Sequence, residues 1–188
     1  MRVIAIVGRS GSGKTHLIER LIRQFAARGL RVATVKHTHH HDFELDLPGK
    51  DSWRHRAAGA SATLLVSDRR FALLGDLSQP MDLADVLQQL PAADLLLIEG
   101  FWKLRTVPKI EVFRSFLGAR EPGADDSGLA AIALPRDDNG ELPNGLTSLD
   151  LDDTAAIADF ILNLPLASTL PATRRRGPAT RLARLHTR

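Results

Sequence analysis

The chain has 188 residues, of which 44% are hydrophobic and 25% are charged, and this composition is ordinary for a protein with one folded core. The first apolar run, residues 3–7, is followed at once by glycines and polar residues. It is too short for a signal peptide or a membrane span, so we expect a cytoplasmic protein. The absence of cysteine excludes disulfides, thiolate metal ligands and cysteine nucleophiles.

The net charge of +3 arises from the C-terminal end of the chain. Residues 165–188 contain no acid and six arginines, namely Arg174, Arg175, Arg176, Arg181, Arg184 and Arg188. Subtracting these six charges from +3 leaves −3 for residues 1–164, which argues against a nucleic-acid binder. We expect residues 1–164 to form the folded domain and residues 165–188 to form a flexible basic tail, with an arm for an anionic partner as the alternative.

The first 36 residues predict one right-handed strand–helix–strand unit. Residues 3–7 form a continuous apolar run with β-branched side chains, as in a buried parallel strand. Apolar residues then recur at helical spacing from Leu17 to Phe25, and Gly29 marks the end of that helix. Residues 31–36 form the second strand.

Strands and helices continue to alternate as far as residue 162. We expect helices at 51–58, capped by Asp51 or Ser52, at 83–90 and at 152–162. Strands are expected at 62–66, 71–74, 95–98, 109–113 and 130–134. This order predicts an α/β protein with the three-layer P-loop NTPase fold and a mostly parallel central sheet.

A glycine-rich loop lies between the first strand and the first helix. Its sequence, GRSGSGKT at residues 8–15, matches the Walker A pattern G-x-x-x-x-G-K-[ST] in full. In this position backbone N–H groups can converge on phosphate oxygens, the lysine can reach the β and γ phosphates, and the threonine hydroxyl can coordinate Mg²⁺. We therefore predict a nucleotide site made of Gly8, Ser10, Gly11, Ser12, Gly13, Lys14, Thr15 and His16.

The acid that such a site needs on its metal side is expected to be Glu99. It follows the most apolar run of the chain and precedes Gly100, so it should lie at the carboxyl end of a buried strand, where ligands of open α/β sheets collect. Asp94 lies at the other end of the same strand and is expected to be a strand-entry residue. We predict catalytic roles for Lys14 and Glu99, while no arginine finger or water-orienting glutamine can be recognised, so hydrolysis should be slow.

Four histidines, His37, His39, His40 and His41, follow the second strand. With the nearby acids Asp42, Glu44 and Asp46 they could bind Zn²⁺ or Ni²⁺, or form an ordinary polar loop with adventitious metal affinity. Their spacing does not decide between these possibilities. Their position at the same edge of the sheet as the phosphate loop favours a function related to the nucleotide.

Six motifs together resemble the molybdopterin-guanine dinucleotide biosynthesis protein B (MobB) family. They are GRSGSGKT, VKHTHH, DLPGKDS, AAGA, LLLIEGF and PKIEVFR, and the similarity is close over residues 1–115. The resemblance implies a dimeric protein that binds GTP and Mg²⁺, hydrolyses GTP weakly and assists the molybdenum cofactor guanylyltransferase. That enzyme attaches GMP to molybdopterin, so molybdopterin or its molybdenum form is also an expected ligand.

The resemblance also implies roles for residues outside the phosphate loop. Asp46 would join Thr15 and Glu99 around the metal. A switch loop bordering the nucleotide and the pterin would comprise Lys36, His37, His39, His40, Lys50, Asp51 and Arg54. The chain departs from the family pattern where a Ser-Asp pair is expected near the base; here Asp137 could accept the guanine N1 and N2 hydrogens, or Asp-Asp-Asn-Gly could simply form a turn. The arginine tail is a second departure.

Three other functions remain open on the sequence. The first is a nickel-insertion GTPase, a metallochaperone, although the chain lacks cysteine and an N-K-x-D or T-K-x-D base motif. The second is a non-catalytic adaptor that binds GTP as a structural ligand and docks the nucleotidyltransferase. A small-metabolite kinase is the third, although no lid or acceptor site can be recognised.

Overall fold

The computed structural model describes residues 1–165 except 39–42, 78, 121–127, 139 and 141–144. The predictions for the tail beyond residue 165 and for His39, His40, His41 and Asp42 therefore lie outside the described residues. None of the helices in the described part of the chain is long and apolar enough to cross a membrane.

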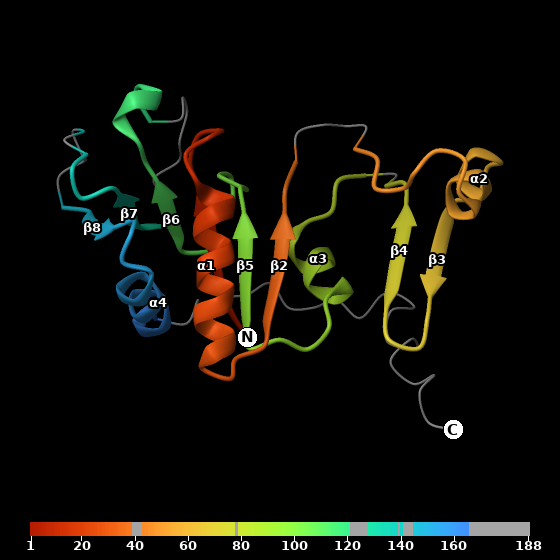
Figure 1. Cartoon of the computed structure of the whole chain (residues 1–188), viewed down its shortest axis with the longest axis horizontal. Helices are drawn as coiled ribbons and strands as arrows, with labels where there is room; N and C mark the ends of the chain where they lie inside the picture. Colours follow the sequence, from red (N-terminus) through yellow and green to blue (C-terminus); the bar gives the residue numbers. More distant parts are fainter. Residues whose placement is uncertain (39–42, 78, 121–127, 139, 141–144, 166–188) are drawn as a thin grey trace.

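The described residues form a parallel six-stranded sheet in the order β2-β5-β1-β6-β7-β8 (Figure 1). Its strands are β1 (Arg2–Val7), β2 (Val32–Lys36), β5 (Leu95–Glu99), β6 (Lys109–Val112), β7 (Leu129–Leu134) and β8 (Thr147–Asp150). Helices α1 (Lys14–Ala27) and α4 (Thr154–Asn163) pack on one face, and α3 (Leu83–Gln89) packs on the other. The expected three-layer α/β fold is confirmed.

The central strand β1 is apolar from Val3 to Val7 because both of its faces are buried. Ile4 and Ile6 point into the core beneath α1 and α4, whereas Val3, Ala5 and Val7 point into the core beneath α3. Since successive side chains of a strand face opposite sides of the sheet, a strand with helices on both faces needs apolar residues at every position. Ile4 and Ile6 are 0% exposed, and burial of each contributes about 1.5–3 kcal/mol.

Two of the helices begin at side-chain caps. The Asp153 carboxylate accepts from the backbone N–H of Ala156 at the start of α4, and Asp82 and Asp85 form a reciprocal capping box at the start of α3. The prediction that Asp51 or Ser52 caps α2 (Asp51–Ala57) is wrong. Neither Asp51 nor Ser52 caps this helix, which begins after Lys50, and the Ser52 hydroxyl instead donates to Asp46 Oδ1 at 2.8 Å.

Strands β3 (Ala62–Val66) and β4 (Phe71–Gly75) form a separate antiparallel hairpin, as the sequence predicted. With α2 this hairpin lies at one end of the molecule, beyond β2 and α3 (Figure 1). Strand β8 was not expected from the sequence, because its four residues TSLD lack an apolar run and are exposed or half-buried.

Candidate functional site

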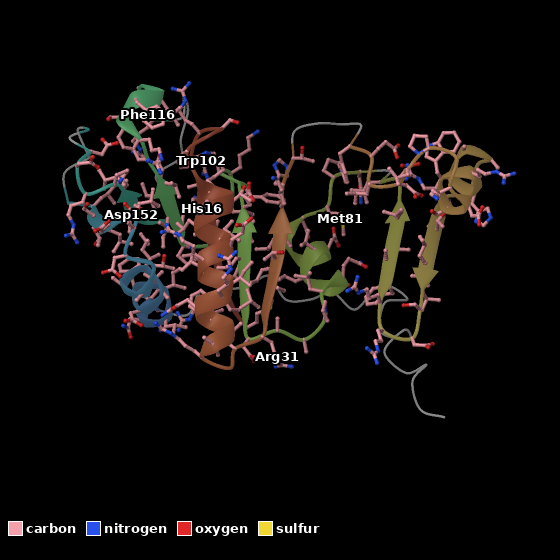
Figure 2. All side chains as sticks on the ribbon, in the orientation of Figure 1. His16, Arg31, Met81, Trp102, Phe116 and Asp152 are labelled. Atoms are coloured by element: carbon pink, nitrogen blue, oxygen red, sulfur yellow. The ribbon has the colours of Figure 1, made fainter. Side chains whose placement is uncertain are left out.

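The glycine-rich loop lies at the carboxyl edge of the parallel sheet, where β1, β2, β5 and β6 all end. Glu99 at the end of β5 is the register partner of Ile6 on β1 and of Lys36 on β2. Figure 2 shows His16, Trp102 and Phe116 toward this edge and Arg31 at the opposite one. The fold therefore brings the predicted phosphate loop and the predicted metal-side acid to one place.

The loop has a conformation that requires glycine. Gly8, Gly11 and Gly13 have φ values of 137°, 78° and 102°, which L side chains rarely adopt. At Gly8 there is also no room, because a Cβ would lie 2.3 Å from the carbonyl oxygen of Val112 on β6. Ser12 is 1% exposed, so the loop folds inward at this residue and leaves Gly11 exposed.

The Lys14 side chain folds back along the loop. Its Nζ donates to the carbonyl oxygens of Gly8 at 2.8 Å and Arg9 at 2.7 Å. These acceptors are neutral, and a bond from the same ammonium group to a phosphate oxygen would be stronger, because both partners would then be charged. The position of the lysine is thus compatible with its predicted role.

Thr15 and Glu99, both predicted to face the metal, are in direct contact. The Thr15 hydroxyl donates to Glu99 Oε1 at 2.9 Å, and the Lys36 ammonium lies 3.4 Å from the same oxygen. Glu99 is 14% exposed, whereas Lys36 is 65% exposed. One hydroxyl and one carboxylate oxygen are thus placed together, and oxygen is the ligand type that Mg²⁺ prefers.

Asp94, at the other end of β5, has the structural role that its position suggested. It accepts hydrogen bonds from the backbone N–H, Nε and Nη2 of Arg31. These bonds, together with the positive charge of Arg31, hold the pKa of Asp94 well below its usual range.

Asp46, the third predicted metal ligand, is engaged elsewhere. It accepts from Ser52 on α2, and segment 43–50 runs from beyond β2 toward α2, away from α1 (Figure 1). Its role at the metal stays a prediction. Among the described residues there is no group of three histidines or acids able to hold a metal ion.

The described residues of the expected switch loop fall into two groups. Lys36 and His37 lie beside Glu99. The Lys36 ammonium is near Glu99 Oε1, and the backbone N–H of His37 donates to the Glu99 carbonyl oxygen at 3.0 Å. The His37 ring also packs against the Phe101 ring, with 4.1 Å between the two centroids. The second group belongs to α2 and the residue before it. There, an open groove is lined by Asp51, Trp53, Arg54, His55, Ala57 and Ala58, and Lys50 immediately precedes the helix.

The loop after β7 holds Asp137 and Asp138 in different ways. Asp137 is exposed. Asp138 accepts from the backbone N–H groups of Ser115 at 2.9 Å and Gly140 at 3.0 Å, and the Ser115 bond is the main cause of its lowered pKa. The Asp138 N–H donates to the Pro135 carbonyl at 3.0 Å, which closes a turn over residues 135–138. The turn expected over residues 137–140 includes residue 139, which lies outside the described residues. The role of Asp137 toward guanine stays a prediction.

Two features near the loop were not singled out from the sequence. Arg114, which follows β6, donates from Nε to the Ser12 carbonyl at 3.0 Å. Glu111 on β6 is 1% exposed and pairs with Arg120. Both Glu111 and Arg114 belong to the motif PKIEVFR, which was the available signal, but their contacts depend on strand order and are not visible in the sequence.

Comparison with known proteins identifies the family of the chain. The family model described as "Molybdopterin guanine dinucleotide synthesis protein B" matches residues 3–135. The molybdopterin-guanine dinucleotide biosynthesis adapter protein of Haemophilus influenzae is 39% identical over 163 residues, covering 86% of this chain and 88% of that protein. The protein of the same name from Escherichia coli is 36% identical over 167 residues, covering 85% and 91%.

The fold agrees as well. A crystal structure of Bacillus subtilis MobB matches with a TM-score of 0.68 and 30% identity, over 86% of this chain and 96% of that one. The sequence identity, the extent of the match and the shared fold lead to one conclusion: the chain belongs to the molybdopterin guanine dinucleotide synthesis protein B (MobB) family.

Proposed function

We propose that the protein binds GTP with Mg²⁺ on residues 8–15 and acts as an adapter in the synthesis of molybdopterin-guanine dinucleotide. The contact between Thr15 and Glu99 at the mouth of the phosphate loop is the observation that carries the nucleotide part. The names of the relatives from H. influenzae and E. coli support the adapter part. The partner is a guanylyltransferase that joins GMP to molybdopterin.

Each residue of the site has a defined task in this proposal. Lys14 exchanges its bonds to the Gly8 and Arg9 carbonyls for bonds to the β and γ phosphates. Thr15 and Glu99 hold the metal side, the latter directly or through water. Hydrolysis is slow in the absence of a partner, because no arginine finger or water-orienting glutamine can be recognised in the sequence.

Residues beside Glu99 connect the nucleotide to the expected switch loop. Lys36 approaches the same carboxylate oxygen as Thr15, and His37 is bonded to the main chain of Glu99. A ligand that draws Glu99 toward a metal therefore acts directly on the beginning of the loop that leads to α2. This is how nucleotide binding is transmitted toward Lys50, Asp51 and Arg54. The positive charges of Lys50 and Arg54 and the neighbouring Trp53 ring suit an anionic pterin.

The proposed assembly is a homodimer built on the β3–β4 hairpin. A two-stranded hairpin is at best marginally stable in water, and this one exposes apolar side chains along both strands. Val66, Phe71 and Leu73 are 67%, 60% and 54% exposed. A second copy of the chain that pairs with this hairpin covers these side chains and extends the sheet.

The nucleotide part is tested by titration calorimetry with GTP and ATP in the presence of Mg²⁺. Binding of GTP is expected for the wild-type protein and none for Lys14→Ala, while Arg23→Ala, a charge change on the exposed face of α1, serves as the matched control. Unchanged GTP affinity in Lys14→Ala refutes the assignment. The adapter part is tested by single-turnover GTP hydrolysis and guanylyl transfer with the transferase present, where stimulation by the wild-type protein but not by Lys14→Ala is expected.

A further inference from the structure

The Arg114 side chain contacts the phosphate loop, although it lies far from the loop in the sequence. It follows β6 and Phe113, and its Nε donates to the carbonyl oxygen of Ser12 at 3.0 Å, across 102 positions of sequence. Its guanidinium group also lies against Gly13, where a Cβ would be 3.7 Å from Nη2 and 3.9 Å from Nε. The arginine therefore contacts the peptide unit that joins Ser12 to Gly13.

This contact fixes the direction of a second group. In a planar trans peptide unit the C=O and the N–H point in opposite directions. Because Arg114 donates to the Ser12 carbonyl, the N–H of Gly13 must point to the opposite side of this peptide unit, away from the guanidinium group. A cationic donor on the carbonyl also polarises the peptide unit, which makes its N–H a stronger hydrogen-bond donor.

The surroundings of Arg114 hold both partners in place. Ser12 is 1% exposed, so moving this residue would expose buried surface. On the other side of Arg114, the ring of Phe116 in the 3₁₀ turn Ser115–Leu117 lies 6.0 Å from the guanidinium carbon. Asp138, anchored to Ser115 N–H, provides a nearby negative charge that Arg114 stabilises.

We propose that Arg114 is a positioning residue of the phosphate site, which orients and polarises the Gly13 N–H so that this group donates to a phosphate oxygen of the nucleotide. The inference rests on the proposed nucleotide binding and adds a residue outside the loop to that site. Through Asp138 and Ser115, it also links the phosphate loop to the turn after β7.

The test uses three variants of the full chain. Arg114→Met keeps the length of the side chain but has no donor, Arg114→Lys keeps a positive charge, and Arg23→Met, which removes an exposed charge from α1, is the control. Affinities for GTP and for inorganic tripolyphosphate, both with Mg²⁺, are measured by calorimetry. The loss of one charge-assisted hydrogen bond predicts affinities for both ligands about tenfold weaker in Arg114→Met, a smaller loss in Arg114→Lys and none in the control.

A second readout reports on the amide itself. In ¹H–¹⁵N spectra without nucleotide, the Gly13 amide proton is expected to shift upfield in Arg114→Met, because the peptide unit is no longer polarised, and to move back in Arg114→Lys. Thermal unfolding checks that each variant is folded. If Arg114→Met does not fold, Arg114→Gln decides, since its neutral amide forms a weaker bond and predicts a loss of roughly threefold.

The outcomes separate this inference from the proposed function. If the wild-type protein binds GTP no better than Lys14→Ala, the proposed function fails and this inference fails with it. If the wild-type protein binds GTP and the folded Arg114 variant binds it equally well, only the inference is overturned. It is also overturned if GTP affinity falls while tripolyphosphate affinity does not, since Arg114 would then act on the nucleoside.

Discussion

The Thr15 hydroxyl donates a hydrogen bond to Glu99 Oε1 at 2.9 Å, which joins the start of α1 to the end of β5 across 84 positions of sequence. The Lys36 ammonium lies 3.4 Å from the same oxygen. This carboxylate oxygen is therefore satisfied by a hydroxyl and a cation. A Mg²⁺ ion bound beside this oxygen would compete with the Lys36 ammonium for it, whereas the Thr15 hydroxyl could face the metal through its oxygen and still donate to Glu99.

The first prediction concerns the charge of Glu99. Glu99→Gln keeps the shape of the side chain and an oxygen that can accept from Thr15, but removes the negative charge that attracts Mg²⁺. We expect GTP affinity in Mg²⁺ to fall by about tenfold, equivalent to about 1.4 kcal/mol. Calorimetry in Mg²⁺ and in EDTA measures this effect. In EDTA the wild-type protein and the variant should bind alike, and a difference that persists there would show that Glu99 does not act through the metal.

The second prediction concerns Lys36. Lys36→Met removes the cation that competes with Mg²⁺ for Glu99, so the Mg²⁺ concentration at half-maximal GTP binding should fall by roughly threefold, as expected for a largely exposed ion pair. Titration of Mg²⁺ against a fluorescent GTP analogue measures it. Arg23→Met, which removes an exposed charge from α1, is the control. An increase in the required Mg²⁺ would instead favour the role implied by the family resemblance, in which Lys36 contributes charge to a phosphate or pterin.

The third prediction concerns the hairpin. Phe71, the register partner of Val66, is 60% exposed in the single chain. If a second copy covers this pair, Phe71→Asp should convert the dimer into a monomer at micromolar concentration, because a buried carboxylate without a partner is costly. Sedimentation velocity measures the change. Phe116→Asp is the matched control, since Phe116 is 74% exposed and lies far from the hairpin (Figure 2). A monomeric wild-type protein, or a dimeric Phe71→Asp, contradicts the expected interface.

The fourth prediction concerns pH and Asp138. The pKa of Asp138 is lowered in the folded chain, first by the Ser115 N–H. A lowered pKa means that the carboxylate stabilises the fold above its ordinary value of 3.8, and that this contribution is lost as the pH falls below that value through the folded pKa. Asp138→Asn should therefore be less stable than the wild-type protein at pH 7.

The difference between the two proteins should shrink as the pH falls below about 4, because the carboxylate of the unfolded chain is protonated first and that of the folded chain only at its lower pKa. Urea unfolding at a series of pH values measures this convergence. Asp137→Asn, a change at the exposed neighbour, is the control and should leave the unfolding midpoint at pH 7 unchanged. A gap between the wild-type protein and Asp138→Asn that stays constant down to pH 2 would show that the carboxylate charge is not what holds the Ser115 N–H.

Local patterns were sufficient to predict most elements and the centre of the site. The run before Gly8, the helical spacing after Lys14 and the apolar strand before Glu99 are each contained in a few consecutive residues. Because ligands of parallel sheets collect at the carboxyl ends of strands, these elements also predicted that Glu99 would lie near the phosphate loop. Strand β8 was missed because its sequence is polar, and the α2 cap was wrong because Ser52 found a partner in Asp46.

Contacts between distant segments could not be obtained in this way. Lys36 meets Glu99 because β2 pairs with β5, and Arg114 meets Ser12 because β6 lies beside β1. The choice of Asp138 rather than Asp137 as the anchored acid likewise depends on where the fold places Ser115, at the start of the 3₁₀ turn after β6. Periodicity specifies which residues form a strand, but the order of strands in a sheet depends on non-local pairing and packing, so these three contacts follow from the assembled fold.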